Sequence, residues 1–185
     1  MLVETIVLSL IIGKIRGGRI KNLEQIKFKA WYLLLLGFLL EIISLLLFAN
    51  TNLKIAKIIT DKFFIIQIFT YILLILILIL NIRKKGVKII LFGTILNFIP
   101  IMANDGRMPV SKVALEKLNL YKQLELLQSN KILTHVLIDK STKFYYLSDI
   151  IPISQIISIG DILISIGIFL LIQFYMKSFN KVLER

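Results

Sequence analysis

The chain has 185 residues, of which 57% are hydrophobic, and its mean hydropathy is +0.86. A soluble domain of this composition would expose much apolar surface to water, so the composition favours an integral membrane protein. The 23 Lys and Arg exceed the 11 Asp and Glu, but they lie in short stretches between apolar runs. That pattern indicates membrane topology and contact with anionic lipid rather than nucleic-acid binding. Cysteine is absent, which excludes disulfides, thiolate metal sites and cysteine nucleophiles.

Five apolar runs predict an all-α fold, a polytopic bundle of transmembrane helices that forms a single integral membrane domain over residues 1–185. The longer runs have about the 20 residues that are needed to cross roughly 30 Å of hydrocarbon. The first run is short and carries Glu4, so a short span and an interfacial helix both fit it, and the pattern favours the span. The predicted spans are residues 2–13, 30–49, 63–82, 87–103 and 153–176.

The basic residues between these runs predict the orientation, because cytoplasmic loops carry an excess of Lys and Arg. Residues 14–29 hold six Lys and Arg, residues 83–88 hold four, and the tail after residue 176 holds three. These stretches are expected in the cytoplasm, whereas residues 50–62 and 104–152 are expected outside. The prediction is a multi-pass protein of the cell membrane with its N-terminus out and its C-terminus in.

The external segment 104–152 is long enough to need structure of its own. Ser111 has the character of a helix N-cap, and residues 113–128 then place apolar side chains at helical spacing. This predicts an amphipathic helix on the outer membrane surface. Residues 132–138 predict a short strand or a short helix, and the aromatic run 144–146 is typical of a chain that re-enters the membrane interface.

Three polar side chains lie inside apolar runs, namely Glu41, Asn97 and Asp161. Ionisable groups within a membrane are costly, so they usually mark a functional or packing site. At about 1.5 Å per residue, all three lie roughly 9 to 12 Å below the external ends of their helices. Each shares a helix face with small or polar residues, which include Ser158 in the last run. We expect these faces to meet and to form a polar site in the outer half of the bilayer.

The most motif-like stretch is Asn104-Asp105-Gly106-Arg107, just above this level. Gly106 permits a sharp turn with positive φ, and the Arg107 guanidinium can pair with a carboxylate or a phosphate. Asp149 stands at the other end of the external segment. The sequence therefore predicts one outward-facing pocket with candidate catalytic acids Asp105, Asp149 and Asp161 and candidate binding residues Glu41, Asn97, Asn104, Arg107 and Ser158.

Three stretches together carry a family resemblance: Arg16-Gly17-Gly18-Arg19, residues 104–111, and Leu147-Ser148-Asp149 followed by Ser158-Ile159-Gly160-Asp161. They resemble the domain of unknown function family 5317, an uncharacterised family of small bacterial membrane proteins, over nearly the whole chain. The resemblance implies a bacterial plasma-membrane protein. It implies no activity, because that family has no established one.

A second resemblance, of arrangement only, is to lipoprotein signal peptidases. Those enzymes use two aspartates near the outer membrane face, one closing a span and one opening the last span, and Asp105 and Asp161 are similar in placement. The spacing Asn104-Asp105-Gly106-Arg107 departs from that family's Asn-x-x-Asp-Arg pattern. The loop between the two aspartates is also longer here, and the chain has one more predicted helix.

Two classes of function fit these residues. The favoured class is a binding, transport or accessory membrane subunit, in which Glu41 and Asp161 bind a cation, relay protons or form hydrogen bonds between helices. The alternative is an aspartic-type membrane hydrolase or peptidase, in which Asp161 shares a proton with Asp105 or Asp149 and activates water against a membrane-anchored substrate.

A metal site is less favoured. His135 is the only histidine and has no second ligand at short spacing, so it is expected to be an ordinary surface or interface residue. We expect no metal, no cofactor and no nucleic-acid partner. The expected partners are the lipid bilayer and either another membrane protein or a membrane-anchored substrate.

Overall fold

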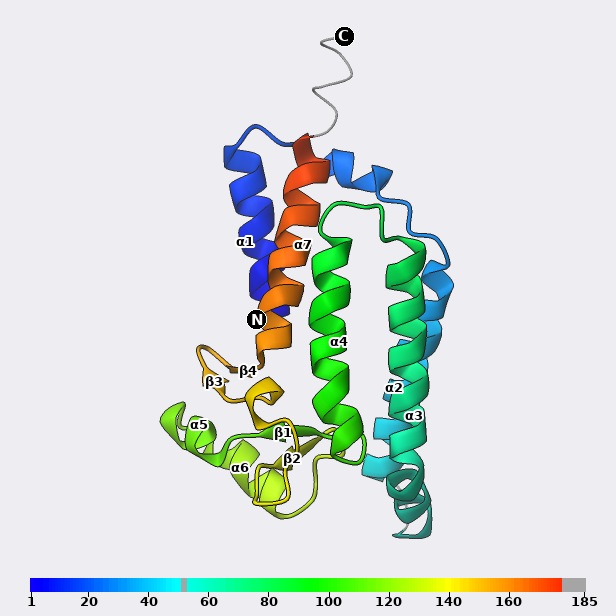
Figure 1. Cartoon of the computed structure of the whole chain (residues 1–185), viewed down its shortest axis with the longest axis vertical. Helices are drawn as coiled ribbons and strands as arrows, with labels where there is room; N and C mark the ends of the chain where they lie inside the picture. Colours follow the sequence, from blue (N-terminus) through cyan, green and yellow to red (C-terminus); the bar gives the residue numbers. More distant parts are fainter. Residues whose placement is uncertain (51–52, 178–185) are drawn as a thin grey trace.

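The computed structural model describes residues 1–50 and 53–177, in which five helices form an elongated bundle (Figure 1). Neighbouring helices pack in the order α1, α7, α4, α3, α2, so the first and last helices of the chain lie side by side. A short 3-10 helix, η1 (Ile20–Gln25), follows α1. The bundle helices are α1 (Leu2–Ile15), α2 (Trp31–Asn50), α3 (Leu53–Leu80), α4 (Val87–Ala103) and α7 (Ile159–Lys177).

Among the described residues, three helices are long and apolar enough to cross a membrane. They cover Trp31–Ala49, Lys57–Leu80 and Ile159–Lys177, with mean hydropathies of 2.5, 3.0 and 2.0. Helix α4 is apolar but shorter, and the 14 residues of α1 reach about 21 Å. Helix α2 exposes large apolar side chains such as Leu34 and Phe38, as lipid contact requires. These features support a membrane protein, while the number of spans and their orientation stay predictions.

Two helix boundaries differ from the predicted spans by more than two residues. Helix α3 begins at Leu53 rather than at residue 63, because no Gly or Pro interrupts the sequence before its end. Helix α7 begins at Ile159 rather than at residue 153, because the residues before it pair as two short antiparallel strands. These strands are β3 (Ile151–Pro152) and β4 (Ile156–Ile157).

Helices α4 and α7 approach closely because glycines face each other across their interface. Gly93 faces Gly160, and Gly86, at the N-cap of α4, faces Gly167. A Cβ added at Gly93 would lie 2.6 Å from the Gly160 carbonyl oxygen, and one at Gly167 would lie 2.8 Å from the Gly86 carbonyl oxygen. Only small residues permit such contact between helix backbones in a membrane. The glycines thereby fix the register in which side chains of α4 and α7 meet.

Residues 104–158 fold into a small unit at one end of the bundle, which we name the cap unit (Figure 1). Strands β1 and β2 pair in parallel, and Val110 packs with Leu115, Leu124 and Leu127 in a core of the unit's own. Besides β3 and β4, the cap unit contains β1 (Met108–Val110), α5 (Lys112–Lys117), α6 (Tyr121–Gln128), β2 (His135–Leu137) and the 3-10 helix η2 (Tyr145–Leu147).

The amphipathic helix predicted over residues 113–128 is in fact two helices. Ser111 caps α5 as predicted, since its hydroxyl oxygen accepts a hydrogen bond from the Ala114 N–H. The chain then turns at Asn119, which adopts a left-handed conformation with φ of 55° and separates α5 from α6. Leu115, Leu124 and Leu127 are buried in the core of the cap unit, whereas Val113 and Tyr121 are exposed. Residues 132–138 were predicted to form a short strand or a short helix, and the structure shows a strand over residues 135–137.

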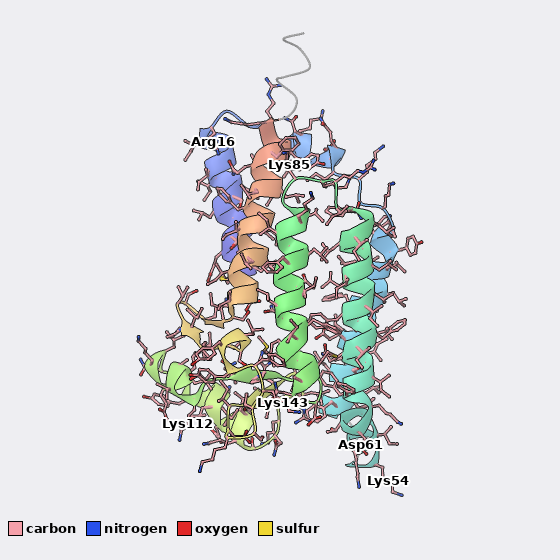
Figure 2. All side chains as sticks on the ribbon, viewed as in Figure 1. Arg16, Lys54, Asp61, Lys85, Lys112 and Lys143 are labelled. Atoms are coloured by element: carbon pink, nitrogen blue, oxygen red, sulfur yellow. The ribbon has the colours of Figure 1, made fainter. Side chains whose placement is uncertain are left out.

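Charged side chains gather at both ends of the bundle. Arg16 and Lys85 lie at the end where α7 finishes, whereas Lys112 and Lys143 lie at the opposite end with the cap unit (Figure 2). The stretches 14–29 and 83–88, predicted to be cytoplasmic, are therefore at the same end. The cap unit, predicted to be external, is at the other end.

Candidate functional site

A cavity of about 270 Å³ lies between α2, α3, α4, α7 and the cap unit. It brings together three acidic side chains, and none of its described lining residues is Lys or Arg, although the chain carries a net charge of +12. We name it the acidic cavity. Its polar lining consists of Glu41 from α2, Gln67, Thr70 and Tyr71 from α3, Asn97 from α4, Thr134, His135 and Asp149 from the cap unit, and Asp161 from α7.

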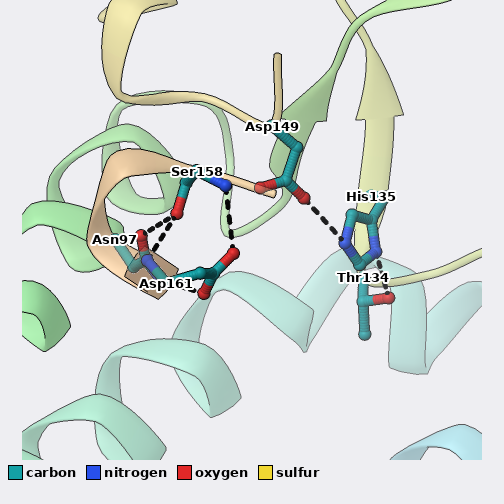
Figure 3. Close-up of polar contacts among 6 residues, drawn as sticks. All are labelled: Asn97, Thr134, His135, Asp149, Ser158 and Asp161. Carbon is teal, nitrogen blue, oxygen red and sulfur yellow. Dashed lines mark hydrogen bonds and ion pairs between the residues drawn. The ribbon is translucent and has the colours of Figure 1, made fainter. Parts of the chain in front are cut away.

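Strand pairing within the cap unit places His135 and Asp149 beside each other. Strand β1 lies in the middle, with β2 along one edge and Asp149 on the other, where the Asp149 N–H donates to the Pro109 carbonyl oxygen at 2.9 Å. His135 Nε2 then lies 3.5 Å from Asp149 Oδ2, and His135 Nδ1 lies 2.8 Å from Thr134 Oγ1 (Figure 3). Parallel pairing of β1 with β2 thus turns His135 toward the cavity, while 34% of its side chain stays exposed.

The Asp149 carboxyl group is almost completely buried, with 7% of the residue exposed. Its Oδ1 atom accepts no hydrogen bond from any residue that the structure describes. Burial raises the pKa of Asp149 above its ordinary value, the hydrogen bond and charge of His135 oppose this rise, and the neighbouring Asp161 adds to it. The unpartnered Oδ1 atom can accept a hydrogen bond from a donor within the cavity.

This raised pKa predicts how Asp149 affects stability. The folded protein holds the proton of Asp149 more tightly than the unfolded chain does, so protonated Asp149 contributes to the stability of the fold. This contribution is complete below the ordinary pKa of 3.8 and is lost as the pH rises through the raised value. Relative to the variant Asp149→Asn, the wild type should therefore lose stability as the pH rises above about 4. Unfolding in detergent at a series of pH values measures this difference.

The substitution Asp139→Asn provides a control with the opposite sign. Hydrogen bonds from Ser141 and Thr142 lower the pKa of the exposed Asp139, so its contribution is present above the ordinary pKa and is lost as the pH falls through the lowered value. The two variants should thus show opposite pH trends against the wild type. Parallel trends would mean that Asp149 is not buried as the structure shows.

The Asp161 side chain forms a capping box with Ser158 at the start of α7. Ser158 is the N-cap, and its Oγ accepts from the Asp161 N–H at 3.0 Å, while Asp161 Oδ2 accepts from the Ser158 N–H at 3.1 Å. Asp161 Oδ1 accepts from Asn97 Nδ2 at 2.8 Å, and Asn97 Oδ1 accepts from Ser158 Oγ at 2.7 Å (Figure 3). The three side chains therefore join α4 to α7 in one closed network.

This network bears on the aspartic hydrolase considered from the sequence. A proton-sharing pair of acids needs a carboxyl oxygen of each acid directed at the other or at a common water. Both oxygens of Asp161 already accept hydrogen bonds from Asn97 and Ser158, so they hold α4 and α7 together. The geometry thus favours a positioning role for Asp161 over a catalytic one.

Glu41 has a different environment. It projects into the acidic cavity from α2, at one edge of the bundle, and no described residue forms a hydrogen bond or ion pair with its carboxylate. Gln67, 5% exposed and on the facing helix α3, likewise has no hydrogen-bonding partner among the described residues. Unpaired polar groups of this kind are unfavourable inside a membrane unless something else satisfies them.

Asn104, Asp105 and Arg107 lie outside the acidic cavity. They line a second cavity of about 680 Å³, on the other side of the chain that leads into β1. Asn104 is used structurally, because its side chain donates to the Lys143 carbonyl oxygen at 2.9 Å and accepts from the Lys143 N–H at 3.0 Å. Asp105 is exposed and has a φ of 55°. The predicted gathering of Asp105 with Asp161 over one pocket is therefore not what the structure shows.

Sequence reasoning missed several lining residues. Gln67, Thr70 and Tyr71 were open to detection, since positions i, i+3 and i+4 share a helix face. The Ser158-x-x-Asp161 spacing before an apolar run was a capping-box signal. Within residues 1–50 and 53–177, no group of three or more His, Asp or Glu side chains is arranged to hold a metal ion.

Comparison with known proteins places the chain in a family without assigning it an activity. An uncharacterized protein of Thermotoga maritima is 26% identical over 176 residues, which cover 92% of this chain and 89% of that protein. No solved structure matches the chain. The model of the family of unknown function DUF5317 matches residues 25–173, which include the whole acidic cavity. The chain therefore belongs to the family of unknown function DUF5317.

Proposed function

We propose that this protein is an integral protein of the bacterial plasma membrane that binds a positively charged group in its acidic cavity. It crosses the membrane five times, with α1 as a short first span, its N-terminus outside and its C-terminus inside, so that the cap unit covers the cavity on the outer face. It acts there as a binding, transport or accessory subunit, with a further membrane protein as a natural partner.

The observation that carries this proposal is the unpaired Glu41. A carboxylate inside an apolar helix requires a counter-charge or hydrogen-bond donors, and the cavity offers no Lys or Arg among its described lining residues. Asp149 contributes a second acid with an unpartnered oxygen, and the Asp161 carboxylate adds to the negative potential. A cationic ligand would satisfy both Glu41 and Asp149, whereas an anion would face three acids.

Binding of a small amine tests the proposal. Wild-type protein in a neutral detergent should bind butylamine, and Glu41→Gln should weaken this binding at least about tenfold, because a charge-assisted hydrogen bond contributes roughly 1.5–3 kcal/mol. Isothermal titration calorimetry measures both affinities. The matched control is Glu24→Gln, the same substitution at an exposed position in η1 outside the cavity.

Three results would contradict the proposal. One is that the wild type binds no butylamine, and another is that Glu41→Gln binds it as tightly as Glu24→Gln does. Loss of binding in both variants would equally show that the acidic cavity is not the binding site.

A further inference from the structure

A groove on the outside of the bundle adjoins the acidic cavity, with which it shares lining residues. It lies between α2 and α3, has a volume of about 160 Å³, and is lined chiefly by apolar residues that include Leu33, Leu34 and Phe38. Three of its lining residues, Glu41, Thr70 and Leu74, also line the acidic cavity. Glu41 therefore stands at the junction between a polar chamber and an apolar groove.

The groove faces the surroundings of the bundle rather than its interior. Helix α2 lies at one edge of the bundle and packs against α3 (Figure 1). Leu34 and Phe38, which line the groove, are 51% and 58% exposed. In a membrane these side chains contact acyl chains, so the groove opens sideways into the hydrocarbon of the bilayer.

We propose that the ligand is a single-chain amphiphile with an amine headgroup, which enters from the bilayer between α2 and α3. The ammonium group lies in the acidic cavity beside Glu41, and the alkyl chain lies in the groove. This inference rests on the proposed function and adds the class of ligand and its route of entry.

The dimensions and direction of the groove suit such a molecule. From Leu33 to Glu41 along α2 is about 12 Å, close to the roughly 15 Å depth of hydrocarbon in one leaflet. The polar chamber lies toward the cap unit and the groove runs away from it, toward the beginning of α2. The headgroup would thus point toward the cap unit from the middle of α2, and the chain would extend along the half of α2 that lies away from the cap unit.

The acidic side chains of the cavity favour a cationic headgroup over an anionic or a neutral one. A fatty acid or an anionic lipid would bring a further negative charge close to Glu41, Asp149 and Asp161, in a region where charge interactions are weakly screened. A neutral alcohol would leave the carboxylate of Glu41 without a counter-charge. An ammonium group supplies both positive charge and several N–H donors, for which the Glu41 carboxylate and Asp149 Oδ1 can act as acceptors.

The test compares dodecylamine with butylamine in variants that fill the groove. Leu34→Trp adds bulk at an exposed groove position, and Gly37→Leu adds it in the floor, where the nearest atom to an added Cβ is Thr70 Cγ2 at 3.5 Å. Each should weaken dodecylamine binding at least about tenfold and leave butylamine binding unchanged. Leu39→Trp, at an exposed position of α2 outside the groove lining, is the matched control.

All proteins are compared in the same neutral detergent, so partition of the amine into micelles is common to every measurement. Dodecanoate should not bind, and Glu41→Gln should weaken the binding of both amines. If Leu34→Trp binds dodecylamine as tightly as Leu39→Trp, or if dodecanoate competes with dodecylamine, the amphiphile inference is overturned while the cation-binding function stands. Failure of butylamine to bind the wild type would remove the proposed function itself.

Discussion

Replacement of Gly160 by alanine is expected to destabilise the protein by about 3 kcal/mol, the sum of overpacking and of lost buried hydrogen bonds. A Cβ at Gly160 would overlap Asn97 Oδ1 and would lie 2.7 Å from the Gly93 carbonyl oxygen. Because the Gly93 oxygen belongs to a helix backbone, α4 and α7 must separate or Asn97 must leave its network. Unfolding of the detergent-solubilised protein by increasing dodecyl sulfate, followed by circular dichroism, measures the loss.

The same substitution at Gly37 is the control. Gly37 is also a helical glycine at a contact between helices, but an added Cβ would lie 3.5 Å from its nearest neighbour, an ordinary van der Waals distance. Gly37→Ala should therefore be close to neutral or slightly stabilising, because alanine is the better helix former. Equal effects of the two substitutions would show that α4 and α7 are not in the close contact described.

Replacement of Asp161 by alanine is expected to cost about 3 kcal/mol, because it removes an N-terminal cap and leaves buried donors unpaired. The Ser158 N–H and the Asn97 amide would both lose their acceptor, and the network between α4 and α7 would open. The same dodecyl sulfate titration measures this effect. Ser158→Ala should show a smaller loss, since it leaves the Asp161 bond to Asn97 in place.

Asp161→Asn separates a hydrogen-bonding role from a role of the charge. Its amide oxygen can still accept from the Ser158 N–H, and the Asn97 side chain can turn over so that its oxygen accepts from the new amide. This variant should therefore retain most of the stability that Asp161→Ala loses. If both variants are equally unstable, the negative charge of Asp161 is essential and the capping account is insufficient.

The order of helices around the bundle depends on contacts between segments that are distant in the sequence, and hydropathy along the sequence does not reveal them. Periodicity and basic residues predict where apolar helices lie and which loops share an end, and the ends of the bundle have the predicted loops. The neighbours of each helix are set by its packing surface. The glycines that join α4 to α7 were visible in the sequence, but their pairing across the interface was not.

The candidate site was also only partly predictable, because the sequence shows which residues interrupt an apolar run but not which of them meet. Glu41, Asn97 and Asp161 stand out because each interrupts an apolar run, and the structure places all three around one cavity. The sequence favoured Asp105 as the partner of Asp161 and left Asp149 as the alternative, since both are aspartates beside a span. Only Asp149 lines the cavity, because the turn before β1 carries Asp105 to the other side while Gly106 and Met108 face the acids.

The sequence by itself determined that this is a DUF5317 chain with helices apolar enough for a membrane, and it identified the polar positions inside them, because both depend on local composition and on spacing along one helix. The tertiary structure alone decided which polar groups meet and which remain free. His135 and Asp149 reach the cavity through strand pairing between distant segments, and Asp161 is satisfied by Asn97 from another helix while Glu41 is not. Hydrogen-bond satisfaction is a property of three-dimensional neighbours, so it cannot be assigned from residue type.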